Sequence, residues 1–185
     1  MRAVHKSLLD AVLQIRPAPS SLLDIGCGDG SFTRALCHCL PNTSITGLDL
    51  SLPRYLTGAT GICFVEGSVE RLPFPSASFD LVTASLSMHH WNDKEMGIGE
   101  IARVLKAGGH LVIGDPLLQG WLGNPLLGRL AQSIDRGCFA SLPELETYLQ
   151  SSGFASFAVA LVPNTFRSTF LVTAQKAWSV GVLPQ

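Results

Sequence analysis

A glycine-rich turn at residues 24–31 carries the side chains best suited to hold a ligand. It reads DIGCGDGS and lies between a short apolar run and an amphipathic one. Glycines at such a turn let a ligand approach the main chain, and the amide groups that open the following helix face that ligand. Asp49, at the end of the next apolar run, is placed to reach ribose hydroxyls. Together these features predict a site for a nucleoside-type cofactor rather than a purely structural turn.

The charge and spacing of the turn restrict the kind of cofactor. Dinucleotide-binding turns read G-x-G-x-x-G and hold a pyrophosphate at the helix N-terminus. Here the spacing is G-x-G-x-G, with Asp24 leading the turn and Asp29 inside it. Because the two carboxylates would repel a pyrophosphate, we expect a cationic ligand, and a nicotinamide-dependent oxidoreductase is disfavoured.

Two adjacent histidines, His89 and His90, are the candidate catalytic residues. They follow the strand expected at 79–84. Histidine titrates near neutral pH, so either side chain could act as a general base. The alternative is that one or both only close the loop or contact the cofactor. Met88 and Trp91 are interpreted as packing or pocket-wall residues.

The elements that position these residues alternate along the chain. Short apolar runs predict strands at 21–25, 44–48, 62–65, 79–84 and 111–113, and helical spacing predicts helices at 4–13, 32–40 and 142–150. Another helix is expected before the fifth strand, with its apolar face formed by Met96, Ile98, Ile101, Val104 and Leu105. Alternating strands and helices predict an α/β fold with a mainly parallel sheet. Runs at 154–162 and 166–174, joined by Pro163 and Asn164, predict an antiparallel hairpin at one edge.

The length of 185 residues favours one domain over residues 1–185, with a short helix within 1–19. The glycine- and leucine-rich stretch at 116–140, which includes Trp121 and a candidate helix at 126–134, is either a substrate cap or a dimer surface.

Composition excludes several functional classes. Thirteen basic and fourteen acidic residues give a net charge of −1, which lacks the basic footprint of a nucleic-acid-binding protein. No apolar run is long enough to span a bilayer, and residues 1–19 do not resemble a signal peptide. Five cysteines without a C-x-x-C pair predict reduced thiols and a cytoplasmic location. No metal site is expected at Cys37-His38-Cys39, because helix positions two apart point about 200° from each other.

The chain closely resembles the class I S-adenosylmethionine (SAM)-dependent methyltransferases, in particular the small-molecule type. The likeness covers residues 20–115 in the order of the family, and the matching segments are 23–30, 47–51, 67–74, 78–82, 89–91 and 103–109. It implies a three-layer, Rossmann-like fold whose seven-stranded sheet is mostly parallel, with an antiparallel C-terminal strand. It also implies SAM as cofactor and S-adenosylhomocysteine as product.

The resemblance assigns roles to matching residues. Asp24 and the turn backbone at Gly26, Cys27, Gly28 and Gly30 would hold the methionine part of the cofactor. Asp49 would bind the ribose hydroxyls, and the adenine would lie against Leu50, Gly67, Ser68 and Val69. Ser85 and Leu86 would line the path to the methyl group.

Two departures from the family pattern bear on function. Relatives commonly carry an acid where Ser68 stands, and many have a longer arm before the first strand. The stretch 50–61 is also short, so a turn is expected there in place of a helix. The substrate side is therefore expected to be open, or covered by a second copy or a partner chain. The leading hypothesis is methyl transfer to O, N or C of a small molecule, and the alternative is a catalytically silent SAM-binding subunit.

Overall fold

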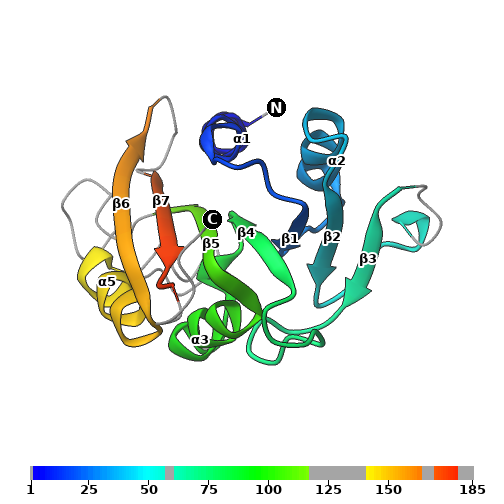
Figure 1. Ribbon diagram of the computed structural model, residues 1–185. Coiled ribbons are helices and arrows are strands. Elements are labelled where there is room, and N and C mark those ends of the chain that lie inside the picture. Colours follow the sequence, from blue (N-terminus) through cyan, green and yellow to red (C-terminus); the bar gives the residue numbers. More distant parts are fainter. Residues whose placement is uncertain (1, 57–60, 117–140, 164–168, 179–185) are drawn as a thin grey trace, which may run out of the picture.

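A twisted central sheet dominates the structure (Figure 1). The computed structural model describes residues 2–56, 61–116, 141–163 and 169–178. In these residues seven strands form one sheet in the order β3-β2-β1-β4-β5-β7-β6. Their bounds are β1 (Ser21–Ile25), β2 (Ser44–Asp49), β3 (Cys63–Glu66), β4 (Phe79–Ser85), β5 (Leu105–Pro116), β6 (Phe154–Val162) and β7 (Thr169–Lys176). Strands β1 to β5 pair in parallel, whereas β7 pairs antiparallel with both β5 and β6. The predicted mostly parallel sheet with a C-terminal hairpin at one edge is confirmed.

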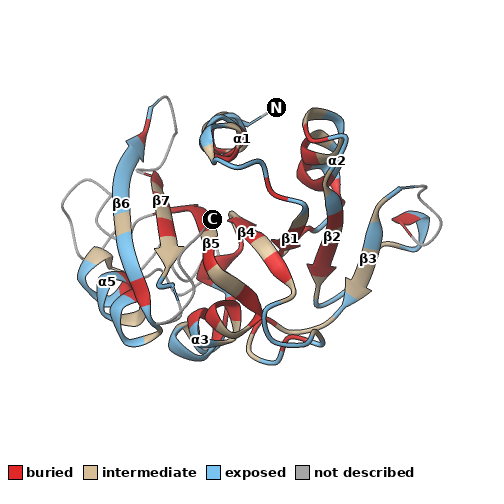
Figure 2. Ribbon diagram, viewed as in Figure 1, coloured by how far each residue is buried: buried red, intermediate tan, exposed pale blue. Residues whose placement is uncertain are grey.

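Helices cover both faces of the sheet and complete three layers. In Figure 1, α1 (Ala3–Gln14) and α2 (Ser31–Cys39) lie on one face, and α3 (Lys94–Val104) and α5 (Leu142–Ser151) lie on the other. Each pair encloses its own apolar core, one around Leu8 and Leu36 and the other around Ile101 and Leu149. Figure 2 shows the buried residues concentrated on the central strands between these layers.

Local signals explain where these helices begin and end. The Asp93 side chain accepts a hydrogen bond from the Met96 amide at the start of α3. Ser141 and Glu144 form a reciprocal capping box at the start of α5, and Gly153 follows its end with a positive φ of 84°. Two short 3-10 turns, η1 (Arg54–Leu56) and η2 (Met88–His90), complete the described helical elements. In the described part of 50–61, η1 takes the place of a longer helix, as expected.

Two details of the expected pattern are wrong. Met96 is half-exposed, because α3 turns Ile98, Ile101 and Val104 towards the sheet and leaves Met96 on the opposite side. Leu105 begins β5 rather than ending the helix, and β5 is much longer than the expected 111–113. The extension arises because Leu105 pairs with Phe79 on β4 before a shift in register, and Gly108, with a positive φ of 72°, lies in the irregular stretch before His110 pairs with Leu81.

Other expectations lie wholly or partly outside the described residues. These are the cap or dimer segment at 116–140 with its helix at 126–134 and Trp121, the turn residue Asn164, and the start of the last strand at 166–168. Among the described helices, none combines the length and apolarity that crossing a membrane requires.

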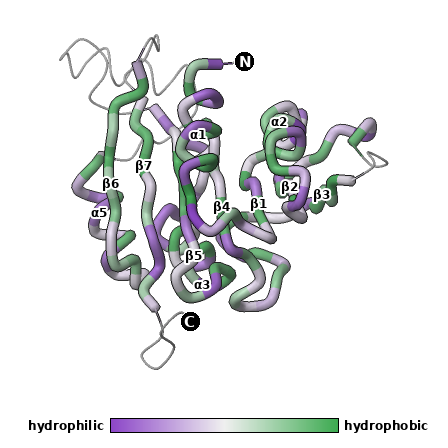
Figure 3. The backbone as a smooth tube through the Cα atoms, turned by 45° about the horizontal axis from the view of Figure 1, so that its top comes forward, coloured by the Kyte–Doolittle hydropathy of each residue, from purple (hydrophilic) through white to green (hydrophobic). Residues whose placement is uncertain are grey.

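Strand β6 is the outer strand of the sheet and is unusually apolar. Its sequence, FASFAVALV, contains no charged residue, and Figure 3 shows the apolar character along its length. Leu161 on this strand is 68% exposed, and Val159 is also exposed. This edge thus presents apolar side chains at the surface.

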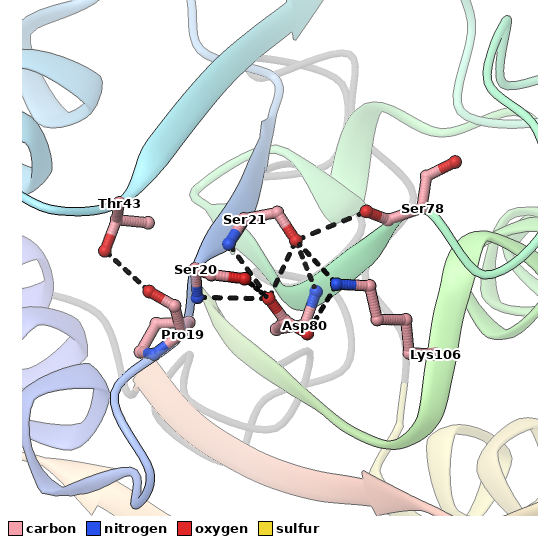
Figure 4. Close-up of polar contacts among 7 residues, drawn as sticks. All are labelled: Pro19, Ser20, Ser21, Thr43, Ser78, Asp80 and Lys106. Atoms are coloured by element: carbon pink, nitrogen blue, oxygen red, sulfur yellow. Dashed lines mark hydrogen bonds and ion pairs between the residues drawn. The ribbon is translucent and has the colours of Figure 1, made fainter.

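A polar network fixes the start of β1 against β4 at the end of the sheet away from the glycine turn (Figure 4). Asp80 Oδ2 accepts hydrogen bonds from the amides of Ser20 (3.0 Å) and Ser21 (2.9 Å) and from both hydroxyls. Asp80 Oδ1 pairs with Lys106 Nζ at 2.8 Å. Burial alone would raise the pKa of Asp80, but the bonds from Lys106 and the two serines hold it well below the ordinary value.

Replacing Asp80 by Asn should therefore destabilise the fold by about 2 kcal/mol at pH 7, the value of a hydrogen-bonded charge. Because the pKa of Asp80 is depressed in the folded state, this stabilisation is complete above about pH 4 and is lost in more acid solution. Urea unfolding of both proteins at pH 7 and pH 3 measures the difference. Lys106→Met should cost less, since its partly exposed ion pair is screened by water. An equal or larger loss in Lys106→Met would contradict this account.

Candidate functional site

The glycine turn is anchored to β2 through its backbone. The amides of Gly26 and Cys27 donate to the carbonyl of Leu48 (2.8 and 3.1 Å), and the amide of Gly28 donates to Asp49 Oδ2 (2.8 Å). Gly26 has a φ of 70°, and a Cβ at this position would overlap the side chain of Ser87. Only glycine therefore fits position 26 in this arrangement.

Two cavities open on either side of this turn. The first, which we call the β2-side cavity, has a volume of about 500 Å³ and includes Gly26, Gly28, Asp49, Leu50, Gly67, Val69, Glu70, Leu86, Ser87, His90, Trp91 and Asn92 in its lining. The second, the α1-side cavity, has a volume of about 650 Å³ and is lined by Arg2, His5, Asp24, Gly26, Cys27, Gly28, Asp29, Ser31, Phe32, Ser85 and Leu86. Both volumes lie in the range of small-molecule sites. Gly26, Gly28 and Leu86 line both cavities, so the two adjoin at these residues.

The charged groups that line the β2-side cavity are both carboxylates, those of Asp49 and Glu70. Asp49 ends β2, and its carboxylate also accepts from the amide of Ser51 (3.3 Å). Glu70 accepts from the hydroxyl of Ser68 and from the amide of Asn92 (2.9 Å). Burial opposes ionisation of Glu70, but these hydrogen bonds outweigh it and lower its pKa. The cavity therefore offers hydrogen-bond acceptors rather than an anion site.

Asp24 forms the floor of the α1-side cavity and is almost wholly buried. Its two carboxylate oxygens accept from the hydroxyls of Thr33 (2.6 Å) and Thr83 (2.9 Å), which ties β1 to α2 and β4. Burial raises the pKa of Asp24 to about 6, and the charge of Asp49 adds to this effect against the two hydroxyl bonds. Asp24 is thus a carboxylate whose ionisation a nearby cation would favour.

Two residues that the sequence analysis did not predict also line the α1-side cavity. Arg2 and His5, at the start of α1, line it. The His5 ring stacks on Phe32 at a centroid distance of 4.9 Å. Burial, with the charge of Arg2, lowers the pKa of His5. Since Arg2 lines this cavity together with Asp24 and Asp29, the cavity carries charges of both signs.

The segment after β4 forms the wall common to both cavities. Leu86 has a positive φ of 54°, rare for a residue with a branched side chain, and its amide donates to the carbonyl of Gly114 on β5 (2.8 Å). The next residue, Ser87, donates to the carbonyl of Ile25 (3.0 Å). These bonds hold the Leu86 backbone in its strained conformation at the centre of the site.

The two candidate histidines occupy different environments. His90 is exposed and lines the β2-side cavity, whereas His89 is buried and its Nδ1 lies 2.9 Å from Asp115 Oδ1 at the end of β5. The two rings are 4.0 Å apart between centroids. Burial raises the pKa of Asp115, opposed by the hydrogen bond to His89.

The two cavities bring together most of the predicted site residues: Asp24, Gly26, Cys27, Gly28, Asp49, Leu50, Gly67, Val69, Ser85, Leu86 and His90. Gly30, Ser68 and His89 do not line either cavity. Gly30 instead precedes α2, and Ser68 donates its hydroxyl to Glu70. Sequence reasoning missed the part played by Glu70, although it lies in the matching segment 67–74. Arg2 and His5 carried no signal, because only the fold brings α1 to the glycine turn.

The thiol of Cys27, which lines the α1-side cavity, is not suited to nucleophilic catalysis. Burial, together with Asp24 and Asp49, raises the pKa of Cys27 to about 12, so its thiol stays protonated. Cys37 and Cys39 are partly buried on α2. Over the described ranges, no group of three or more histidine, cysteine or acidic side chains is arranged to hold a metal ion.

Comparisons with known proteins agree with this architecture. Residues 23–113 match the family model described as a methyltransferase domain. The chain is 35% identical over 146 residues to a demethylmenaquinone methyltransferase of Deinococcus radiodurans, covering 69% of this chain and 60% of that protein. It is 28% identical over 166 residues to a malonyl-[acyl-carrier protein] O-methyltransferase of Methylococcus capsulatus, covering 83% of this chain and 58% of that protein. The chain therefore spans somewhat less than two thirds of either relative.

A solved structure supports the same fold. Phosphoethanolamine N-methyltransferase 2 of Haemonchus contortus, in complex with S-adenosyl-L-methionine, superimposes with a TM-score of 0.79 at 15% identity. The alignment covers 94% of this chain and 52% of that one.

Proposed function

The chain belongs to the class I SAM-dependent methyltransferase family, and we propose that it transfers the methyl group of SAM to a small-molecule acceptor. The observation that carries this proposal is the Asp49 carboxylate at the end of β2. It lies beside the positive-φ glycine turn and in a cavity of about 500 Å³ whose charged groups are acidic. This arrangement suits ribose hydroxyls and an uncharged base, and it disfavours a phosphate.

The two cavities fit the two halves of such a cofactor. In the β2-side cavity, Asp49 would accept from the ribose hydroxyls, while Leu50 and Val69 would flank the adenine. The α1-side cavity is lined by both Arg2 and Asp24, and charges of both signs suit an amino acid that carries an ammonium and a carboxylate group. Leu86, which lines both cavities, would lie beside the sulfonium.

When bound, SAM supplies an electrophilic methyl group on a good leaving group. The residues of the chain then contribute mainly by fixing the two reactants at attack distance, which can supply about 7–11 kcal/mol of the barrier. The hydrogen bonds that hold Leu86 and Ser87 in place are suited to this positioning. A small-molecule acceptor fits the net charge of −1, since the composition lacks the excess of basic residues expected of a nucleic-acid-binding protein.

Calorimetry with SAM and S-adenosylhomocysteine tests the cofactor. Turnover by the chain alone, with radiolabelled SAM and a panel of hydroxyl, amine and carboxylate compounds, tests the reaction. Absence of binding at millimolar cofactor would refute the proposal. Tight binding without transfer to any acceptor would instead identify a SAM-binding subunit without catalytic activity.

SAM affinity should fall as the pH drops below about 6. The pKa of Asp24 is raised to about 6, and the ammonium group of the ligand favours the ionised carboxylate, so protons compete with SAM. Below that pH, each further unit should weaken binding by up to about tenfold. Calorimetry between pH 5 and 8 measures this dependence.

Asp24→Asn should bind SAM more weakly at pH 7 and lose the pH dependence. Glu95→Gln, which removes an exposed carboxylate from α3, is the matched control and should keep the wild-type profile. A wild-type affinity that stays constant between pH 5 and 7 would contradict the assignment.

A further inference from the structure

A third cavity lies at the end of the sheet away from the glycine turn, where β1 begins. It has a volume of about 280 Å³, and its lining includes Arg16, Lys106, His110 and Trp178. We call it the Trp178 cavity. None of its described lining residues lines the β2-side or the α1-side cavity. Since sites for drug-sized ligands measure about 300–1,000 Å³, this cavity suits a molecule smaller than the proposed cofactor.

Arg16 brings to this cavity a positive charge that no carboxylate in the described part of the chain neutralises. Its Nη1 donates to the carbonyls of Leu13 and Ile15 (both 2.7 Å), which holds the guanidinium at the end of α1. These bonds use both hydrogens of Nη1, so the Nε and Nη2 donors stay available to a ligand. A carboxylate is an anion whose two oxygens match such a pair of N–H groups.

The other charged groups of the described lining neutralise each other. Lys106 Nζ pairs with Asp80 Oδ1 at 2.8 Å, and the second oxygen of Asp80 is bonded to two serines (Figure 4). His110 is half-buried on β5, and because burial lowers its pKa, the ring is mainly neutral at pH 7. The lining therefore carries one unbalanced positive charge, that of Arg16.

The indole of Trp178 forms an aromatic wall of the cavity. A Cβ at Gly108 would overlap this ring, so the ring lies directly on the backbone of β5. Two hydrogen bonds hold the chain here: Gln175 Nε2 donates to the carbonyl of Gly108 (3.0 Å), and the amide of Ala177 donates to the carbonyl of Gly153 (3.0 Å). Trp178 nevertheless remains 49% exposed. A large part of its apolar surface is thus available to a flat ligand.

We propose that the Trp178 cavity binds a small aromatic carboxylate, with its acid group on Arg16 and its ring against the indole of Trp178. A single negative charge matches the one unbalanced cation, whereas a phosphate monoester would bring about two. An uncharged aromatic molecule would leave the guanidinium without a partner. The proposal does not rest on methyl transfer, because the cavity lies apart from the proposed cofactor site.

Titration of the ¹⁵N-labelled chain with 2-naphthoate tests the place of binding. The chain has three tryptophans, and the indole N–H signal that is lost in Trp178→Phe belongs to Trp178. We expect 2-naphthoate to shift this signal in a saturable way, with a Kd of about 1 mM or below. The shift should persist in saturating S-adenosylhomocysteine. A Trp178 signal that does not move, or a shift that S-adenosylhomocysteine abolishes, would overturn the proposal.

The acid group is tested by a change in the protein and by a change in the ligand. Arg16→Gln should weaken 2-naphthoate binding at least about tenfold, because it removes hydrogen bonds from a charged donor. Lys6→Gln, which removes an exposed cation from α1, is the matched control and should bind like the wild-type protein. Thermal unfolding checks that both variants are folded. In the wild-type protein, 2-naphthamide, which keeps the ring without the charge, should bind at least about tenfold more weakly than 2-naphthoate.

Acetate, which keeps the charge without the ring, should not produce a saturable shift of the Trp178 signal. Binding of 2-naphthoate to folded Arg16→Gln within threefold of the wild-type protein would overturn the role of Arg16. Equal affinities for 2-naphthoate and 2-naphthamide would exclude a carboxylate site. Equal affinities for 2-naphthoate and acetate would show an anion site that does not recognise a ring, which contradicts the proposal as well.

Discussion

Replacing Asp49 by Asn should weaken SAM binding by about 1,000-fold. In the proposed complex the carboxylate accepts from both ribose hydroxyls while it holds the amide of Gly28 at 2.8 Å. Hydrogen bonds to a charged group contribute about 1.5–3 kcal/mol each, so losing two amounts to about 4 kcal/mol. At about 1.4 kcal/mol for each tenfold change, this corresponds to three orders of magnitude in Kd. Calorimetry with SAM and with S-adenosylhomocysteine measures it.

A charge-matched control separates this effect from a general loss of negative charge. Asp10→Asn removes an exposed carboxylate from α1 and should bind SAM like the wild-type protein. Thermal unfolding shows whether Asp49→Asn remains folded without ligand. If folded Asp49→Asn binds within threefold of the wild-type protein, the ribose does not lie at Asp49.

Gly26→Ala should lower the free energy of unfolding by about 3 kcal/mol, a large loss for a change of one methyl group. The positive φ of Gly26 costs an alanine about 1–2 kcal/mol. The new methyl group would also overlap Ser87, and overpacking typically costs a further 1–3 kcal/mol. Urea unfolding measures the sum.

Gly28→Ala is the internal comparison. Gly28 also has a positive φ, but no atom of the described residues lies within 4 Å of a Cβ placed there. Its loss of stability should therefore stay near 1 kcal/mol. Because Gly28 lines both cavities, the added methyl group should instead weaken SAM binding. Ser87→Gly combined with Gly26→Ala should recover the packing part of the loss and leave the backbone part. Equal losses in the two alanine variants would show that Ser87 does not restrict position 26.

The positions of most elements could be predicted because local patterns determine them. Apolar runs ended by Gly26 or Asp49 correspond to β1 and β2, and Pro17 and Pro19 lie beyond the end of α1. The length of β5 could not be predicted in the same way. Its first residues pair with β4 across an irregular register, and a contact between strands is not visible in the local sequence.

In the candidate site, too, features set by the local sequence could be predicted, and features that depend on contacts between distant residues could not. The glycine turn could be predicted from a run of consecutive residues, and Asp49 from its position directly after the next apolar run. Both line the cavities in which a ligand is expected. The pairing of His89 with Asp115 joins residues 26 apart in the sequence, and it exists because β4 and β5 are neighbours. Arg2 and His5 likewise reach the site only because α1 packs on the sheet next to α2.

The meeting of the two cavities at Gly26, Gly28 and Leu86 has a consequence for competition among metabolites. Each cavity would recognise one half of the ligand, and a covalent link between the halves acts like a short tether between two binding modules. Such a tether can raise affinity by about 10²–10⁴ over either half alone. Free adenosine or free methionine would therefore compete poorly with the intact cofactor, while the demethylated product, which keeps the link, would remain an effective inhibitor.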